Sequence, residues 1–292
     1  MAGPRKRVGF VSLISFVTGL SALLPAQTNT ISDKQIDVQG RRIHYVEAGS
    51  GPPVVLLHGL GSDLRTWRLT IPALATDFHV YAIDQLGFGQ SEKPEIAYRV
   101  STLADSLDAF LKAAKIDKAS IVGNSLGGWV AALFAISHAD RLDKLVLVDA
   151  AGYGEDSSDL VRDYLSQLDP NTVAAVERFL SSLSPGDQRA LEAAAASYFA
   201  RRSPRGDGYV VGSLVESIMR GEDFLGAEVK QISRPTLVVW GRNDTTIPVR
   251  TADAFARDIP GARKVILDGC AHRPQAQCST DFNSAVKRFL TN

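Results

Sequence analysis

Residues 121–128 read IVGNSLGG, and this stretch decides the fold prediction. It places a G-x-S-x-G pattern, centred on Ser125, after a short apolar run and before a helical pattern. A sharp strand-to-helix turn of this kind presents the serine hydroxyl clear of a sheet, and the flanking glycines leave room for neighbouring backbone. The N-terminus of the following helix also favours developing negative charge. The context predicts that Ser125 is a nucleophile rather than part of a linking turn.

Short apolar runs without polar alternation recur on both sides of this motif. Such runs are typical of strands buried on both faces of a parallel sheet. Helical patterns separate them, which favours right-handed crossovers and a doubly wound, mostly parallel α/β sheet. We predict an N-terminal hairpin at residues 35–38 and 42–47, strands at 54–57, 80–83, 121–122, 145–148, 236–239 and 264–267, and helices at 101–114, 126–135, 251–257 and 280–290.

One interval, residues 153–225, has no buried-strand run. It divides into helical pieces at breaks that contain proline and glycine. These features predict a helical lid inserted in a core of residues 33–152 and 226–292. We expect the lid to take part in substrate choice, because ligand sites favour domain interfaces. A packing layer without a role in substrate choice is the alternative.

The first 26 residues differ from the rest of the chain. A basic cluster at residues 5–7 precedes an uncharged, mostly apolar run at residues 8–24 and then a polar stretch. This is the layout of a secretory signal peptide, and the run is also nearly long enough to span a membrane. We expect an exported protein, periplasmic or secreted, or alternatively one anchored to the membrane by residues 1–26.

Composition excludes several other classes. The 292 residues carry a formal net charge of zero, so no basic excess favours nucleic acid as a partner. The only two cysteines, Cys270 and Cys278, exclude a cysteine-based zinc cluster. In an oxidising compartment they can form a disulfide that brackets His272, and two reduced cysteines are the alternative.

A serine nucleophile needs a histidine to take its proton. Of the five histidines, His272 follows the last apolar run, at the strand end where α/β sheets bind ligands. His58 also ends a strand, but we expect its ring to hold a loop by bonding nearby backbone. The other three histidines are less suitable. His44 lies in the hairpin, and His79 comes just before a strand. His138 is far from the start of the helix after Ser125.

The base in turn needs a carboxylate that fixes its tautomer and stabilises the imidazolium. Asp244 lies just past the run at residues 236–239, and the order serine, aspartate, histidine predicts it in this role. Asp149, directly after residues 145–148, is the main rival because a neighbouring strand can also deliver an acid. Asp268 is a weaker one.

Backbone N–H groups are the usual donors to the oxyanion of the tetrahedral intermediate. Leu126, immediately after the nucleophile, and Leu60, in the loop after residues 54–57, are predicted to supply them. Aromatic residues of both parts are expected to line the acyl pocket, with simple core packing as the alternative for each. They are Trp67, Phe88 and Trp129 in the core part and Tyr153, Tyr164 and Phe224 in the lid.

Five segments in chain order resemble the lidded α/β-hydrolases. This family includes bacterial esterases, carbon-carbon bond hydrolases, cofactor-free haloperoxidases, epoxide hydrolases and haloalkane dehalogenases. The resemblance implies an α/β-hydrolase fold and a triad of Ser125, Asp244 and His272 that needs no metal or organic cofactor. The segments are residues 58–61 (HGLG), 84–91 (DQLGFGQS), 123–128 (GNSLGG), 240–244 (WGRND) with Pro248, and 271–274 (AHRP).

Two residues beside the predicted triad narrow the function. Epoxide hydrolases and haloalkane dehalogenases of this family attack with an aspartate where this chain has Ser125, so both are excluded. Asn124 resembles the carbon-carbon hydrolases of ring-fission products, but Arg273 stands where that group commonly has tryptophan. Breakdown of ring-fission products is expected in the cytoplasm, whereas we expect this protein to be exported. We therefore expect a carboxylesterase or lipase-like enzyme (EC 3.1.1) that acts on a small-molecule ester. We expect it to be a monomer or homodimer. A carbon-carbon hydrolase, a haloperoxidase-like perhydrolase and a non-catalytic ligand receptor of the same fold are the alternatives.

Overall fold

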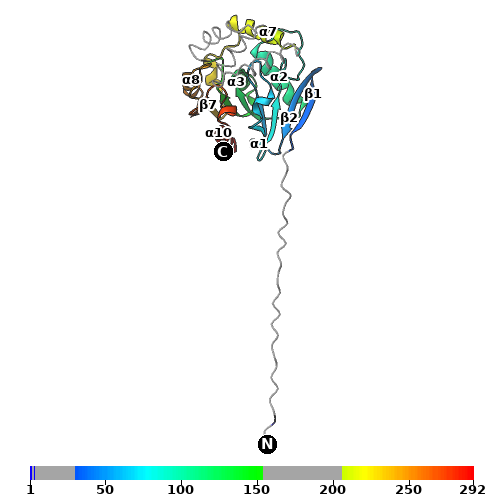
Figure 1. Cartoon of the computed structure of the whole chain (residues 1–292), viewed down its shortest axis with the longest axis vertical. Coiled ribbons are helices and arrows are strands. Elements are labelled where there is room, and N and C mark those ends of the chain that lie inside the picture. The colour runs from blue at the N-terminus through cyan, green and yellow to red at the C-terminus, as the bar shows by residue number, and fades with distance from the viewer. Residues whose placement is uncertain (2, 4–29, 154–205) are drawn as a thin grey trace, which may run out of the picture.

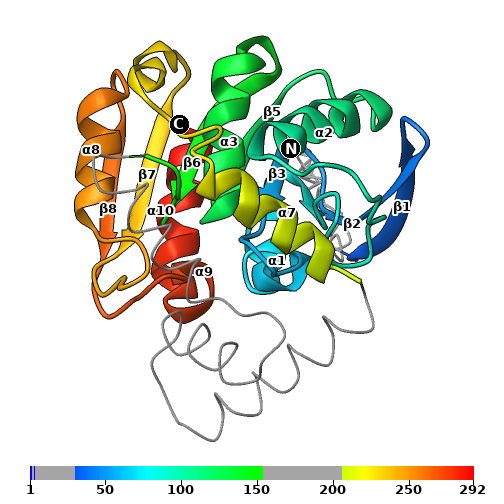
Figure 2. The same cartoon turned by 90° about the horizontal axis from the view of Figure 1, so that it is seen from above.

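A computed structural model describes residues 1, 3, 30–153 and 206–292 of the chain. Its described strands form one sheet in the order β1-β2-β4-β3-β5-β6-β7-β8. The pairs β1–β2 and β2–β4 are antiparallel, and every pair from β4 to β8 is parallel. Figure 2 shows the sheet spreading from β1 at one side to β8 at the other. The predicted doubly wound, mostly parallel sheet of an α/β-hydrolase fold is confirmed.

Each predicted strand is present, with bounds extended by a few residues. Successive side chains of a strand point to opposite faces of the sheet, so an uninterrupted apolar run covers both faces. In β3, Val55 and Leu57 join the core on one face, whereas Val54 and Leu56 join the core on the other. The strands are β1 (Ser32–Val38), β2 (Arg41–Ala48), β3 (Pro53–Leu57), β4 (His79–Ile83), β5 (Ala119–Asn124), β6 (Leu142–Val148), β7 (Thr236–Gly241) and β8 (Arg263–Leu267).

Helices cover both faces of this sheet (Figure 1). The apolar sides of α2 (Val100–Ala113), α3 (Leu126–Ser137) and α8 (Arg250–Asp258) pack into one core, and those of α1 (Ile71–Leu74) and α10 (Ser279–Thr291) pack into the other. This arrangement leaves the carboxyl ends of the parallel strands at one edge, where the loops carry the predicted site residues. The short helices are η1 (Leu64–Trp67), η2 (Ala139–Arg141), η3 (Ala227–Gln231) and α9 (Pro274–Gln277).

Most of the predicted lid lies outside the described residues, as does nearly all of the predicted leader. The described part of the lid contains α7 (Gly208–Met219), whose Val210 and Leu214 are fully buried in the core that also holds α2 and α3. The Ser213 hydroxyl accepts a hydrogen bond of 2.8 Å from the backbone N–H of Tyr98. The described C-terminal part of the predicted lid is therefore packed on the sheet domain.

None of the helices in the described ranges combines the length and apolar character needed to cross a bilayer.

Candidate active site

Ser125 occupies the sharp turn between β5 and α3. Its φ of 56° and ψ of −118° lie in a region that residues with a side chain rarely adopt. Neighbouring backbone enforces the turn: a Cβ on Gly123 would lie 2.1 Å from the carbonyl oxygen of Gly127, and one on Gly127 would lie 2.4 Å from that of Leu57. The N–H of Ser125 donates to the carbonyl of Val148 at 3.0 Å. Both glycines of the G-x-S-x-G pattern are thus required by close backbone contacts around the serine.

His272 and Asp244 are directly hydrogen-bonded. The Nδ1 atom of His272 lies 2.8 Å from Oδ2 of Asp244, and both side chains are buried. The other carboxylate oxygen accepts the N–H groups of Thr246 at 2.8 Å and Ile247 at 3.0 Å, which fixes its orientation. Because a carboxylate only accepts, His272 carries a proton on Nδ1 and presents Nε2 as the basic nitrogen.

Side-chain bonds tie the His272 loop to the strand that ends at Ser125. Asn124, the residue before the serine, donates its amide to the carbonyl of His272 at 3.1 Å. Its amide oxygen accepts from Nε2 of Gln275 at 3.0 Å. Among the described residues, no hydrogen bond joins the Ser125 hydroxyl to the His272 ring, and such bonds often tighten only when substrate binds. The structure therefore brings Ser125, His272 and Asp244 to the same edge of the sheet and links the last two directly.

The loop after β3 lies against Ser125. A Cβ on Gly59 would lie 3.2 Å from Cβ of Ser125, and Leu60 follows in this loop. Leu126 begins α3, so its N–H has no acceptor within the helix. The two predicted oxyanion donors thus lie on segments that border Ser125.

His58 and Gln85 hold this loop in place. The buried His58 ring donates from Nδ1 to the carbonyl of Gly59 at 2.8 Å and accepts at Nε2 from the N–H of Gln85 at 3.1 Å. The side-chain amide of Gln85 also donates to the carbonyl of His58 at 2.7 Å. Sequence reasoning did not single out Gln85, whose only signal was its place in the 84–91 segment.

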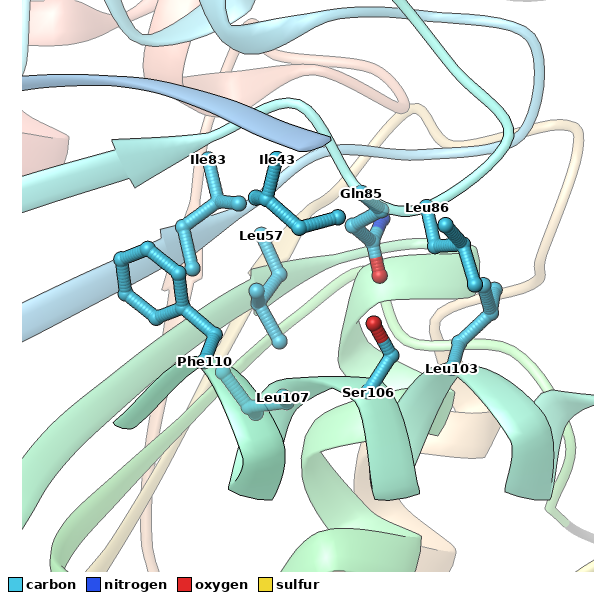
Figure 3. A pocket seen from close by; sticks show the side chains of 9 residues that line it. All are labelled: Ile43, Leu57, Ile83, Gln85, Leu86, Leu103, Ser106, Leu107 and Phe110. Carbon is cyan, nitrogen blue, oxygen red and sulfur yellow. The ribbon is translucent and has the colours of Figure 1, made fainter. Parts of the chain in front are cut away.

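The other end of the Gln85 amide faces a small cavity (Figure 3). Its Oε1 atom is buried and has no hydrogen-bond partner among the described residues, and the Ser106 hydroxyl also lines the cavity. The remaining lining side chains are apolar: Ile43, Leu57, Ile83, Leu86, Leu103, Leu107 and Phe110. Gln85 therefore contributes to the position of the loop after β3 through its two N–H groups and not through its side-chain oxygen.

Cys270 and Cys278 form a disulfide around His272. Their Cα atoms are 6.0 Å apart, and eight positions separate them in sequence. Within this loop, Oε1 of Gln277 accepts from the N–H groups of Ala271 at 3.0 Å and Arg273 at 3.2 Å. The histidine is thus held in a short, cross-linked segment between β8 and α10.

Asp244, not Asp149 or Asp268, is hydrogen-bonded to the His272 ring. Asp268 is an exposed residue that pairs with Arg242. Asp149 is fully buried behind Asp244, and its Oδ1 accepts from the N–H of Gly241 at 3.0 Å. One oxygen of Asp149, one of Asp244 and a ring nitrogen of His272 lie within 4.8 Å of one another, a spacing that a metal ion could bridge, and His272 and Asp244 are already hydrogen-bonded to each other.

The two carboxyl groups differ in their affinity for a proton. Burial, the negative charge of Asp244 and a hydrogen bond with it raise the pKa of Asp149 well above the usual range. Burial also acts to raise the pKa of Asp244, but the charge of His272 and its hydrogen bond, together with that from Asp149, outweigh burial and lower it. Asp244 is therefore the ionised member of the pair.

Three of the predicted pocket aromatics belong to the core. Trp67 and Phe88 are 0% exposed and Trp129 is 1% exposed, so almost none of their surface is accessible. Trp67 packs on Phe282, with ring centroids 6.2 Å apart. Trp129 donates its indole N–H to the backbone carbonyl of Asp223 at 2.7 Å. All three rings lie in the hydrophobic core clusters, and their contact with substrate stays a prediction.

The other predicted pocket aromatics are a fourth core residue, a partly exposed residue and one outside the described residues. Tyr153 is buried, packs on Phe255 and donates its hydroxyl to Asp258 at 2.8 Å. Phe224 is partly exposed, with its ring centroid 4.8 Å from that of Trp129. Tyr164 lies outside the described residues. Of this group, Phe224 alone is a described residue that is partly exposed.

Comparisons with known proteins agree with this architecture. The profile of the alpha/beta hydrolase fold family matches residues 52–277. A 2-hydroxy-6-oxo-6-(2'-aminophenyl)hexa-2,4-dienoic acid hydrolase of Metapseudomonas resinovorans is 30% identical over 265 residues, covering 89% of this chain and 91% of that protein. The solved structure of 2-hydroxy-6-oxo-6-phenylhexa-2,4-dienoate hydrolase from Rhodococcus sp. strain RHA1 has a TM-score of 0.80 at 26% identity, covering 91% of this chain and 100% of that one. A membrane phospholipase A, described as a bacterial virulence factor, has a TM-score of 0.75 at 26% identity, covering 89% and 86%.

Proposed function

Because the chain belongs to the α/β-hydrolase fold family, we propose that this hydrolase works through Ser125 as nucleophile, His272 as general base and Asp244 as the carboxylate that orients the base. The observation that carries the proposal is the 2.8 Å contact between His272 Nδ1 and Asp244 Oδ2, beside the strained turn at Ser125. Nε2 takes the serine proton as Oγ attacks a carbonyl carbon. The N–H groups of Leu126 and Leu60 stabilise the oxyanion.

The proposed substrate class is a 2-hydroxy-6-oxodienoate, cleaved at a carbon-carbon bond. Support comes from the two hydrolases of such acids described above, which match this chain over most of its length. Ser125 Oγ bonds to the 6-oxo carbon, and the bond from that carbon to C5 breaks. For this bond to break, the substrate must first take its 2-oxo form, with the 2-hydroxyl proton moved to C5. The electron pair of the bond then passes through the C3–C4 double bond to the 2-oxo oxygen, and the resulting dienolate takes a proton from His272. Water activated by His272 then releases the acyl group from the serine.

Ester hydrolysis is the second candidate, favoured by signs of export. The disulfide between Cys270 and Cys278 suits an oxidising compartment, and so does the leader-like pattern of residues 1–26. Similarity to a membrane phospholipase A points the same way. The same three residues perform this reaction, with an alcohol departing in place of a carbon fragment. We propose export on these grounds for either substrate class.

A side-by-side assay of both substrate classes tests the proposal. The purified protein is assayed with 2-hydroxy-6-oxohexa-2,4-dienoates that carry varied 6-substituents, and their cleavage is measured as loss of the dienoate absorbance. It is assayed in parallel with p-nitrophenyl esters of graded acyl length. We expect the higher kcat/KM on the dienoates. A higher value on the esters overturns that substrate class in favour of the second candidate.

Variants then test the catalytic residues. Ser125→Ala abolishes turnover of both substrate classes and labelling by a fluorophosphonate, which reacts only with an activated serine. Ser137→Ala is the matched control. This serine lies at the far end of α3, the helix that follows Ser125, and its hydroxyl bonds only to the Leu133 carbonyl among the described contacts. Turnover retained by Ser125→Ala removes the serine from the mechanism. Absence of both turnover and labelling in the wild-type protein overturns the hydrolase proposal.

A further inference from the structure

Two buried carboxyl groups meet behind His272. Asp149 follows β6 and Asp244 follows β7, and these strands are parallel neighbours in the sheet. The side chain of Asp244 and the whole of Asp149 are 0% exposed. Two negative charges side by side in such a site repel each other strongly, so one proton shared by the pair is the stable arrangement.

The hydrogen-bond donors around the pair decide which group holds that proton. Asp244 accepts from the N–H groups of Thr246 and Ile247 and from the His272 ring, and donors of this kind favour an ionised carboxylate. Asp149 accepts one N–H, that of Gly241, at Oδ1. Its Oδ2 is buried and receives no hydrogen bond from a donor among the described residues. An oxygen in that position is satisfied when it carries a proton and donates it to the adjacent carboxylate.

We propose that Asp149 is a positioning residue, protonated at neutral pH, whose Oδ2 hydroxyl donates a hydrogen bond to Asp244 and holds that carboxylate against His272. Asp149 is fully buried, and its described hydrogen bonds run to Gly241 and Val239 and not to Ser125, so its effect on catalysis passes through Asp244. Its backbone supports the role, since the residue is kept at a φ of 43° while its N–H donates to the carbonyl of Val239 at 3.1 Å. The catalytic part of this proposal rests on the triad proposed above, whereas the protonation state does not.

The charged groups that act on Asp149 in the described residues are Asp244, from the loop after β7, and through it His272, from the loop after β8. Both groups favour a protonated Asp149. Whether His272 is positive or neutral, its bond to Asp244 keeps that carboxylate ionised, and the negative carboxylate accepts the Asp149 proton. Asp149→Asn reproduces this state without titrating. Its amide N–H donates where the acid O–H does, and its carbonyl accepts the Gly241 N–H.

Unfolding by urea between pH 4 and pH 8 tests the protonation state without an activity assay. The pKa of Asp149 is raised by folding, so its contribution is fully present below the unfolded pKa and is lost as pH rises towards the folded pKa. Relative to Asp149→Asn, the wild-type folding equilibrium constant therefore falls by about tenfold per pH unit above about pH 4, until the raised pKa is passed. Asp143→Asn is the control, because this exposed aspartate lies on the same strand. Parallel curves for wild type and Asp149→Asn overturn the proposal.

Infrared spectroscopy and kinetics complete the test. The carbonyl band of a protonated carboxyl group is expected in wild type at neutral pH and absent from Asp149→Asn; its absence from wild type also overturns the proposal. Asp149→Leu removes the donor and lowers kcat more than tenfold, and Asp149→Asn recovers most of that loss. Equal kcat for Asp149→Leu and wild type refutes the positioning role. If Asp149→Leu does not fold, the infrared band and the pH curves of Asp149→Asn still decide the protonation state. If fluorophosphonate does not label the wild-type protein, that result counts against the triad and not against the protonation of Asp149.

Discussion

Replacement of Gly127 by alanine tests how closely the strands pack around the serine turn. An added Cβ would lie 2.4 Å from the carbonyl oxygen of Leu57 and 2.6 Å from that of His58, both backbone atoms of β3 and the loop after it. Real Cβ contacts are not found below 3.0 Å, so the start of α3 and this loop must separate by at least 0.6 Å. Overpacking of this kind costs about 1–3 kcal/mol of unfolding free energy. Displacement of a reacting group by about 1 Å costs about 100-fold in rate, so we expect a loss of kcat on the order of tenfold or more.

Gly212→Ala is the matched control for this change. Gly212 also lies in a helix, α7, but a Cβ there meets nothing within 4 Å. Alanine in an open helical position is expected to stabilise the protein by about 0.5–1 kcal/mol, because glycine loses more backbone freedom on folding. Urea unfolding followed by circular dichroism, together with the rate of fluorophosphonate labelling, measures both variants. Wild-type stability and labelling in Gly127→Ala would refute the packing argument.

Three further perturbations have outcomes that the structure determines. Asp244→Asn lowers kcat by about 10⁴-fold, because an amide partner permits the wrong tautomer of the base. Reduction of the bond between Cys270 and Cys278 lowers the unfolding free energy by about 2–3 kcal/mol, from the loop-closure entropy of a short loop. The hydrogen bond from Arg220 lowers the pKa of Glu222 to about 2, so its contribution to stability is present above its usual pKa of 4.5 and is lost as pH falls towards 2.

Each of these has a measurement and a contrary result. Steady-state kinetics decide the first, and kcat within tenfold of wild type in Asp244→Asn would assign the orienting role elsewhere. Urea midpoints with and without dithiothreitol decide the second, for which equal midpoints are the contrary result. For the third, acid unfolding of Glu222→Gln should show a shallower pH dependence between pH 4.5 and 2 than wild type, and superimposable curves would count against the pairing with Arg220.

The sequence by itself determined the strands, most of the helices and the serine turn. These features are local, since apolar runs and helical spacing depend on residues close together in the chain, and the glycines around Ser125 are needed by the turn itself. The parallel sheet followed because buried runs alternate with helical patterns. Chain order was also sufficient to nominate His272 and Asp244, because loops after parallel strands end at one edge.

Only the tertiary structure decided what depends on contacts between distant segments. The place of β4 between β2 and β3 is a matter of pairing that no local pattern encodes. The bond from Asp244 to His272, with Asp149 packed behind the pair, depends on which strand end lies nearer to the last loop. Likewise, a tryptophan such as Trp67 has the same local pattern whether it lines a pocket or fills a core. Its burial was decided by the packing of α10, whose Phe282 covers the ring, because burial is a property of the assembled layers and not of the residue.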